Sequence, residues 1–187
     1  MPEQRDVAVI VGSLRKDSLN RRMAHALAAV APEALRLEIV EIRDLPLYDQ
    51  DLDTDPPAPW VTFRERLRRA DAVLFVTPEY NRSMPGALKN ALDVGSRPPG
   101  QSGWKGKPGA VMTVSPGALG GFGANHHLRQ TLVALNVPTM PHPEAYVGQA
   151  GDLFDADGKI TSDRIRDLTV RFMAAFGAWV EANAPKG

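Results

Sequence analysis

The stretch Val7-Ala8-Val9-Ile10-Val11 is a continuous apolar run, rich in β-branched residues and bounded by Asp6 and Gly12. A strand that is buried on both faces of a parallel sheet has this pattern, so we expect a central parallel strand here. Further apolar runs and one alternating pattern predict four more strands, at residues 37–42, 72–76, 109–114 and 137–140.

Helical patterns separate the predicted strands. Apolar residues recur at helical spacing over residues 19–30, 60–69, 87–94, 125–135 and 165–183. The repeated alternation of strand and helix predicts an α/β fold, with a parallel sheet and helices on both faces. Five strands and five helices fit the flavodoxin-like strand order 2-1-3-4-5. A single domain is expected over residues 1–187, because domains average roughly 100 to 200 residues.

Other segments give further structural expectations. Residues 45–59 contain four prolines and four aspartates, which predict a long, irregular surface loop. Residues 155–158 resemble part of a calcium loop, but the first and twelfth ligand positions do not fit, so a turn is expected. No third ligand is spaced to complete a metal site with His126 and His127, which predicts a polar helix face. A solvated face is also expected for four arginines: Arg64, Arg66, Arg68 and Arg69.

Composition excludes several classes of function. Lysine plus arginine number 22 and aspartate plus glutamate number 22, so the formal charge is zero, which argues against nucleic-acid or membrane partners bound through bulk charge. There is no cysteine, so redox chemistry would need a bound cofactor. No apolar run approaches the roughly 20 residues of a membrane span. The polar stretch Met1–Asp6 does not resemble a signal peptide, so a cytoplasmic protein is expected.

Three loops are expected to meet at one edge of the sheet. In the order 2-1-3-4-5, strands one, three and four are adjacent, and ligands of open α/β sheets bind at the carboxyl ends of strands where the order reverses. The connections after these strands are residues 12–20, 77–86 and 115–123, called here the first, second and third loops.

The first loop has the residue types of a phosphate site. Ser13, Ser18 and Asn20 can donate hydrogen bonds to oxygen, and Arg15 adds a positive charge where the following helix offers free N–H groups. The loop matches neither dinucleotide nor nucleoside-triphosphate motifs. The alternative is that Asp17 or Ser18 only caps the helix.

The second and third loops favour contact with a flat ring. Two prolines and a glycine make the second loop stiff, and Tyr80 offers contact area, although an ordinary turn with a surface tyrosine is an equal alternative. The third loop has four glycines within residues 117–123, which predicts unusual torsions or a close approach by another group. A ring lying against its main chain would need this lack of side chains, and a flexible loop is the alternative.

Three stretches carry a family resemblance. Residues 12–20 (GSLRKDSLN), 78–93 (PEYNRSMPGALKNALD) and 115–121 (SPGALGG) resemble the NAD(P)H-dependent FMN reductases, the group that contains bacterial quinone and chromate reductases. The similarity extends through residues 127–132, so it covers most of the chain. Relatives commonly carry tryptophan in place of Val94 and an aromatic residue in place of His126, and both positions are expected near oligomer contacts.

The resemblance implies a flavodoxin-like fold that holds FMN non-covalently, with NADH or NADPH as co-substrate, in a homodimer or homotetramer. Phosphate binding would fall to residues of the first loop and their amides: Ser13, Arg15, Ser18, Leu19 and Asn20. The isoalloxazine ring would be lined by residues of the second loop: Pro78, Glu79, Tyr80 and Asn81. Ser115 and Gly117 would meet the far edge of the ring.

The implied function is an NAD(P)H:acceptor oxidoreductase. The hypothesis is ping-pong turnover, in which hydride passes to flavin N5 and then to a quinone or similar small acceptor, such as chromate, a ferric chelate or an azo compound. No side chain is required as an acid or base, so none is named catalytic, and Glu79, Tyr80 and Arg82 are expected to shape the acceptor side. The alternatives are a flavodoxin-type electron carrier, which the neutral charge disfavours, and an FMN-free regulatory protein on the same fold.

Overall fold

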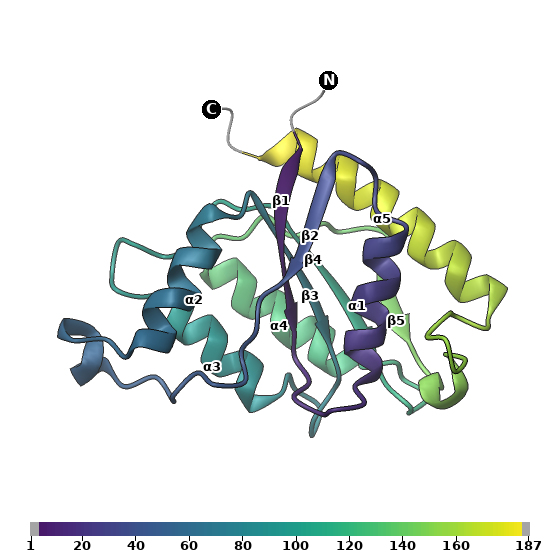
Figure 1. Ribbon diagram of the computed structural model, residues 1–187, viewed down its shortest axis with the longest axis horizontal. Helices are drawn as coiled ribbons and strands as arrows, with labels where there is room; N and C mark the ends of the chain where they lie inside the picture. Colours follow the sequence, from purple (N-terminus) through teal and green to yellow (C-terminus); the bar gives the residue numbers. More distant parts are fainter. Residues whose placement is uncertain (1–3, 185–187) are drawn as a thin grey trace.

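The computed structural model describes residues 4–184 and contains one five-stranded parallel sheet with the order β2-β1-β3-β4-β5 (Figure 1). The flavodoxin-like α/β fold expected from the sequence is confirmed. In chain order the strands are β1 (Arg5–Val11), β2 (Leu35–Ile39), β3 (Ala72–Thr77), β4 (Gly109–Val114) and β5 (Ala145–Val147).

Five α-helices lie on the two faces of this sheet. They are α1 (Leu19–Ala29), α2 (Ala58–Arg69), α3 (Gly86–Gly95), α4 (Phe122–Ala134) and α5 (Asp163–Asn183). Helices α1 and α5 cover one face, and α2, α3 and α4 cover the other (Figure 1). No helix in residues 4–184 is long and apolar enough to cross a membrane.

The position of β1 between two layers of helices explains why its run of apolar residues is uninterrupted. Val7, Val9 and Val11 pack in the core beneath α1 and α5. Ala8 and Ile10 pack in the second core, beneath α2, α3 and α4. Because successive side chains of a strand point to opposite faces, a strand between two helical layers is apolar at every position.

The position of the fifth strand corrects the sequence prediction. Residues 137–140 form only an isolated bridge between Thr139 and Gly109 at the start of β4. The fifth strand, which pairs with β4 on the side away from β3, is Ala145–Val147. Pro138 and Pro141 have no N–H group, so this stretch cannot continue a hydrogen-bonded ladder.

Residues 45–59 are also more regular than predicted. A 3-10 helix, η1, spans Gln50–Thr54, and Asp49 caps it by accepting a hydrogen bond of 3.0 Å from the Asp51 N–H. Helix α2 then begins at Ala58, directly after Pro57. Asp49 and Pro57, two of the residues that suggested an irregular loop, therefore stand at helix starts, where both residue types are favoured.

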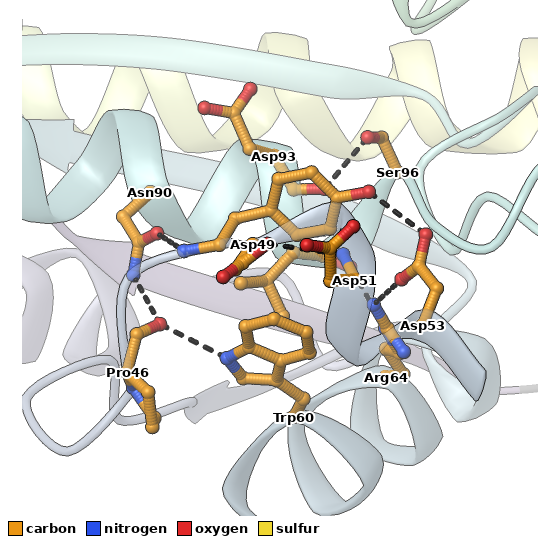
Figure 2. Close-up of polar contacts among 11 residues, drawn as sticks. Pro46, Asp49, Asp51, Asp53, Trp60, Arg64, Asn90, Asp93 and Ser96 are labelled. Atoms are coloured by element: carbon orange, nitrogen blue, oxygen red, sulfur yellow. Dashed lines mark hydrogen bonds and ion pairs between the residues drawn. The ribbon is translucent and has the colours of Figure 1, made fainter. Parts of the chain in front are cut away.

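The expected solvated arginine face is wrong at one position. Arg64 is only 4% exposed, and its Nε donates to the Val94 carbonyl oxygen at 2.9 Å. Its guanidinium also pairs with Asp53 at 3.3 Å and lies over the Trp60 ring (Figure 2). Val94 is itself fully buried.

The side chain of Asn90 on α3 anchors residues 45–48 (Figure 2). Its Oδ1 accepts the Tyr48 N–H at 2.8 Å, and its Nδ2 donates to the Pro46 carbonyl oxygen at 3.0 Å. Trp60 Nε1 donates to the same carbonyl at 3.0 Å. The segment between β2 and α2 is therefore held against both α2 and α3.

Candidate functional site

The carboxyl ends of β1 and β3 meet closely, at the lower edge of the sheet in Figure 1. A Cβ atom at Gly12 would lie 2.1 Å from Thr77 Oγ1, so only glycine fits where β1 ends. The first and second loops leave the sheet from these two neighbouring points, and the third loop follows β4 beside them. The convergence expected from the strand order is thus present.

In the first loop, the start of α1 retains free hydrogen-bond donors. Ser18 is the N-cap, and its Oγ accepts the Arg21 N–H at 3.2 Å, which leaves the hydroxyl hydrogen free to donate. Within residues 4–184, the N–H groups of Leu19 and Asn20 donate no hydrogen bond. Arg15 is exposed and forms no ion pair with any residue of this described range. A helix start with free N–H groups and a free cation is suited to an anion.

Ser13 and Asn20 are buried rather than exposed to solvent. Ser13 Oγ accepts the Arg15 N–H at 3.4 Å, which shapes the loop. Asn20 Nδ2 donates to the Val114 carbonyl oxygen at 3.2 Å, so this side chain ties α1 to the end of β4. Asn20 Oδ1 is buried without a partner in the described part of the chain, as a polar atom beside a ligand site would be.

The second loop is a tight two-residue turn. Tyr80 and Ser83 exchange backbone hydrogen bonds of 2.9 and 3.0 Å, while Asn81 and Arg82 have φ angles of 51° and 65°. These angles are those of a type I′ turn, in which asparagine is common and arginine is not. The strain at Arg82 indicates that surrounding contacts impose this conformation.

The glycines of the third loop are explained mainly by contacts within the protein. A Cβ atom at Gly120 would lie 2.8 Å from the Tyr146 backbone, and one at Gly121 would lie 2.8 Å from Thr113 Cβ. Both residues have positive φ angles, 60° and 80°. Gly117 differs, because among residues 4–184 only Ser115 Oγ, at 3.5 Å, lies within 4 Å of its missing Cβ. Gly117 is therefore the position of these three where another molecule could approach the main chain.

The first and second loops border an open cavity of about 320 Å³. A volume of this order is at the lower end of the range for small-molecule sites. Its lining combines three residues of the first loop with Tyr80 and the start of α3: Gly12, Leu14, Arg15, Tyr80, Pro85, Gly86 and Ala87. The cavity brings together Arg15 and Tyr80, which were predicted to bind opposite ends of one ligand, whereas Ser115 and Gly117 are not part of its lining.

An aromatic cluster lies beside the third loop. The ring centroids of Phe122 and His126 are 4.2 Å apart, and those of Phe122 and Tyr146 are 5.3 Å apart. The Tyr146 hydroxyl lies 3.1 Å from His126 Nε2. Burial and the neighbouring Glu144 carboxylate raise the pKa of the Tyr146 phenol to about 12. Tyr146 therefore stays neutral at physiological pH and can serve as a hydrogen-bond donor.

Sequence reasoning missed several residues of this region. Pro85, Gly86 and Ala87 line the cavity, and their signal was the Pro-Gly pair at the end of the second loop, where a helix begins. His127 was expected on a polar helix face, and its Nδ1 lies 2.7 Å from Ser83 Oγ. The Phe122–Tyr146 contact joins α4 to β5, and no local spacing pattern predicts such a pair.

The fold and the site together define a class of protein. A five-stranded flavodoxin-like sheet carries, at the edge where its strand order reverses, a free helix start with a cation and an adjoining cavity. This donor set fits the phosphate of a mononucleotide, and the neighbouring cavity and open glycine fit a flat ring. The class is that of flavodoxin-like proteins that bind a mononucleotide cofactor.

Comparison with known proteins identifies the family. The family described as NADPH-dependent FMN reductase matches residues 5–152, and the chain belongs to this family. It is therefore an oxidoreductase with FMN as cofactor and NAD(P)H as co-substrate.

Individual relatives resemble the chain over nearly its whole length. It is 59% identical over 184 residues to a quinone reductase of Pseudomonas putida, covering 98% of each chain. It is 49% identical to a 2-hydroxy-1,4-benzoquinone reductase of a Burkholderia species, covering 93% of this chain and 95% of that one.

Among solved structures, FerB from Paracoccus denitrificans, a flavoenzyme NAD(P)H:(acceptor) oxidoreductase, superimposes with a TM-score of 0.91 at 42% identity. The match covers 97% of this chain and 100% of that one.

Proposed function

We propose that this protein is an NAD(P)H:quinone oxidoreductase that uses FMN bound at the carboxyl edge of β1, β3 and β4. The single observation that carries this proposal is the free, positively charged start of α1 beside the 320 Å³ cavity. The similarity to quinone reductases from Pseudomonas and Burkholderia supports a quinone as the acceptor. The net reaction converts NAD(P)H, a proton and a quinone to NAD(P)+ and a hydroquinone.

Residues of the first loop would hold the FMN phosphate. The Arg15 guanidinium supplies positive charge, the Ser13 and Ser18 hydroxyls donate, and the N–H groups of Leu19 and Asn20 point from the start of α1. Charge-assisted hydrogen bonds of this kind are stronger than neutral ones. Phosphate binding would therefore supply much of the affinity for FMN.

The second and third loops would place the isoalloxazine ring. When bound, FMN supplies the redox chemistry by taking hydride from NAD(P)H and passing electrons to the acceptor. Pro78, Glu79, Tyr80 and Asn81 would form one side of the ring site. Within residues 4–184, the N–H groups of Glu79 and Asn81 donate no hydrogen bond and are free to bind ring oxygen or nitrogen atoms. Ser115 and Gly117 would border the opposite edge.

The proposal extends to acceptors, assembly and location. Chromate, ferric chelates and azo compounds are further acceptors we propose, alongside quinones. A homodimer or homotetramer in the cytoplasm is also proposed, and light scattering measures its mass. Exposed apolar side chains on and before α4 support such assembly, because Leu119 and Phe122 are 59% and 51% exposed.

Steady-state kinetics test the proposed reaction. Initial rates would be measured with NADPH and a benzoquinone varied together, and again with NADH in place of NADPH. Parallel double-reciprocal lines are expected, because both substrates would use one site in turn. Intersecting lines would exclude this ping-pong mechanism. If the protein turns over neither NADPH nor NADH, the electron-carrier alternative would be favoured.

A further inference from the structure

The carboxylate of Glu79 joins two loops of the site. Its Oε2 accepts the Ala124 N–H of α4 at 3.0 Å, and its Oε1 lies 3.4 Å from the Arg82 guanidinium. The side chain of Glu79 is 13% exposed. A carboxylate that is mostly buried and bonded at both oxygens is fixed in position.

Helix α4 depends on this carboxylate for its N-terminal cap. Its own N-cap residue is Gly121, which has a φ of 80° and no side chain to accept a hydrogen bond. Glu79 lies 45 residues earlier in the chain and supplies the acceptor that the helix lacks. A negative charge at this end of the helix also interacts favourably with the helix dipole.

The second loop and α4 touch directly. A Cβ atom at Gly123 would lie 2.9 Å from both Glu79 Oε2 and the Arg82 carbonyl oxygen, so there is no space between helix and turn. One helical turn beyond Ala124, His127 Nδ1 lies 2.7 Å from Ser83 Oγ and makes a second connection. The two contacts together hold the strained turn at Asn81 and Arg82 in place.

We propose that Glu79 is a positioning residue, which fixes the second loop against the start of α4 through its contacts with Ala124 and Arg82. This inference rests on the proposed function, since the second loop would form one side of the site for the flavin ring. Glu79 acts through the backbone of its neighbours and does not transfer a proton or an electron. The phosphate site on the first loop is separate and would keep FMN bound when Glu79 is replaced.

The test compares four variants in two assays. Glu79→Ala removes both contacts, Glu79→Gln keeps an oxygen that can accept the Ala124 N–H, and Gly123→Ala forces the turn and α4 apart. Glu181→Ala removes an exposed carboxylate on α5 and is the matched control. The first assay is amide hydrogen exchange at residues 79–83 and at Ala124 in flavin-free protein. The second is FMN affinity together with the visible circular dichroism of the bound flavin.

Glu79→Ala is expected to speed exchange at Ala124 and in the turn by about tenfold, and to weaken FMN binding by about tenfold, as expected for one lost hydrogen bond to a charged group. The circular dichroism of the bound flavin should change in Glu79→Ala and Gly123→Ala. Glu79→Gln should restore wild-type exchange and dichroism to within about threefold, and Glu181→Ala should match the wild type.

Two results would overturn the inference. One is wild-type exchange at Ala124 and wild-type flavin dichroism in Glu79→Ala or in Gly123→Ala. The other is a Glu79→Gln variant as impaired as Glu79→Ala, which would assign the effect to charge alone. A wild-type protein that binds no FMN would instead contradict the proposed function, and the exchange assay on flavin-free protein would still decide whether Glu79 holds the turn.

Discussion

At the scale of single residues, side chains of one type have different roles in this protein. Arg64 is buried and holds the Val94 carbonyl oxygen, whereas Arg15 is exposed and unpaired within the described residues 4–184. Arg64 was predicted to lie on a solvated face, because helical spacing shows only which residues lie on the same side of a helix. Helical spacing does not show that Asp53, eleven residues earlier in η1, pairs with Arg64. An anion-binding role for Arg15 could be proposed from the sequence, because a cation beside a helix N-terminus favours an anion there.

Replacing Arg15 with alanine should weaken FMN binding by about 10- to 100-fold, since a hydrogen bond to a charged group is worth about 1.5–3 kcal/mol. Lys16 is an adjacent exposed cation and gives the matched control. Lys16→Ala should change the affinity by less than about threefold, as is usual for exposed charges. Quenching of FMN fluorescence on titration measures both variants. Equal affinities for the two variants would refute the placement of the phosphate at Arg15.

At the scale of elements, the sequence predicted the buried central strands better than the short edge strand β5 and the third loop. The apolar runs at 72–76 and 109–114 match β3 and β4 within one residue, because burial on both faces leaves a strong local signal. Strand β5 has only three residues and was missed, since so short a run carries no periodicity. The unusual torsions predicted for the third loop are present at Gly120 and Gly121, and these glycines pack against Tyr146 and Thr113.

The segment between β2 and α2 should depend on Asn90 for its attachment. Asn90→Ala would leave the Tyr48 N–H and the Leu45 carbonyl without their partner, so we expect the free energy of unfolding to fall by about 1–3 kcal/mol. The control is Lys89→Ala on the same helix, which breaks only an exposed ion pair with Asp93 and should cost less than about 0.5 kcal/mol.

Urea denaturation measures both free energies, and the slope of unfolding against urea should stay unchanged. A loss in Asn90→Ala no larger than in Lys89→Ala would show that residues 45–48 are held by other contacts.

At the scale of the whole molecule, the meeting point of the three loops could be predicted, because strand order decides it. The family could be predicted from the resemblance carried by residues 12–20, 78–93 and 115–121. The contacts that join the loops could not be predicted. Glu79 and Ala124 are 45 positions apart in the sequence, and Ser83 and His127 are 44 positions apart. The zero net charge is also informative at this scale. A protein with zero net charge has no general attraction for a charged protein partner, and this suits small diffusible substrates.

The central claim is that this protein itself oxidises NAD(P)H on bound FMN and then reduces a quinone. The most direct measurement is an anaerobic titration of the FMN-loaded protein, followed by visible absorption, first with NADPH or NADH alone and then with a benzoquinone. We predict that an equimolar amount of at least one nucleotide abolishes the absorption band of oxidised flavin and that an equimolar amount of quinone restores it. Absorption that neither nucleotide changes would contradict the account.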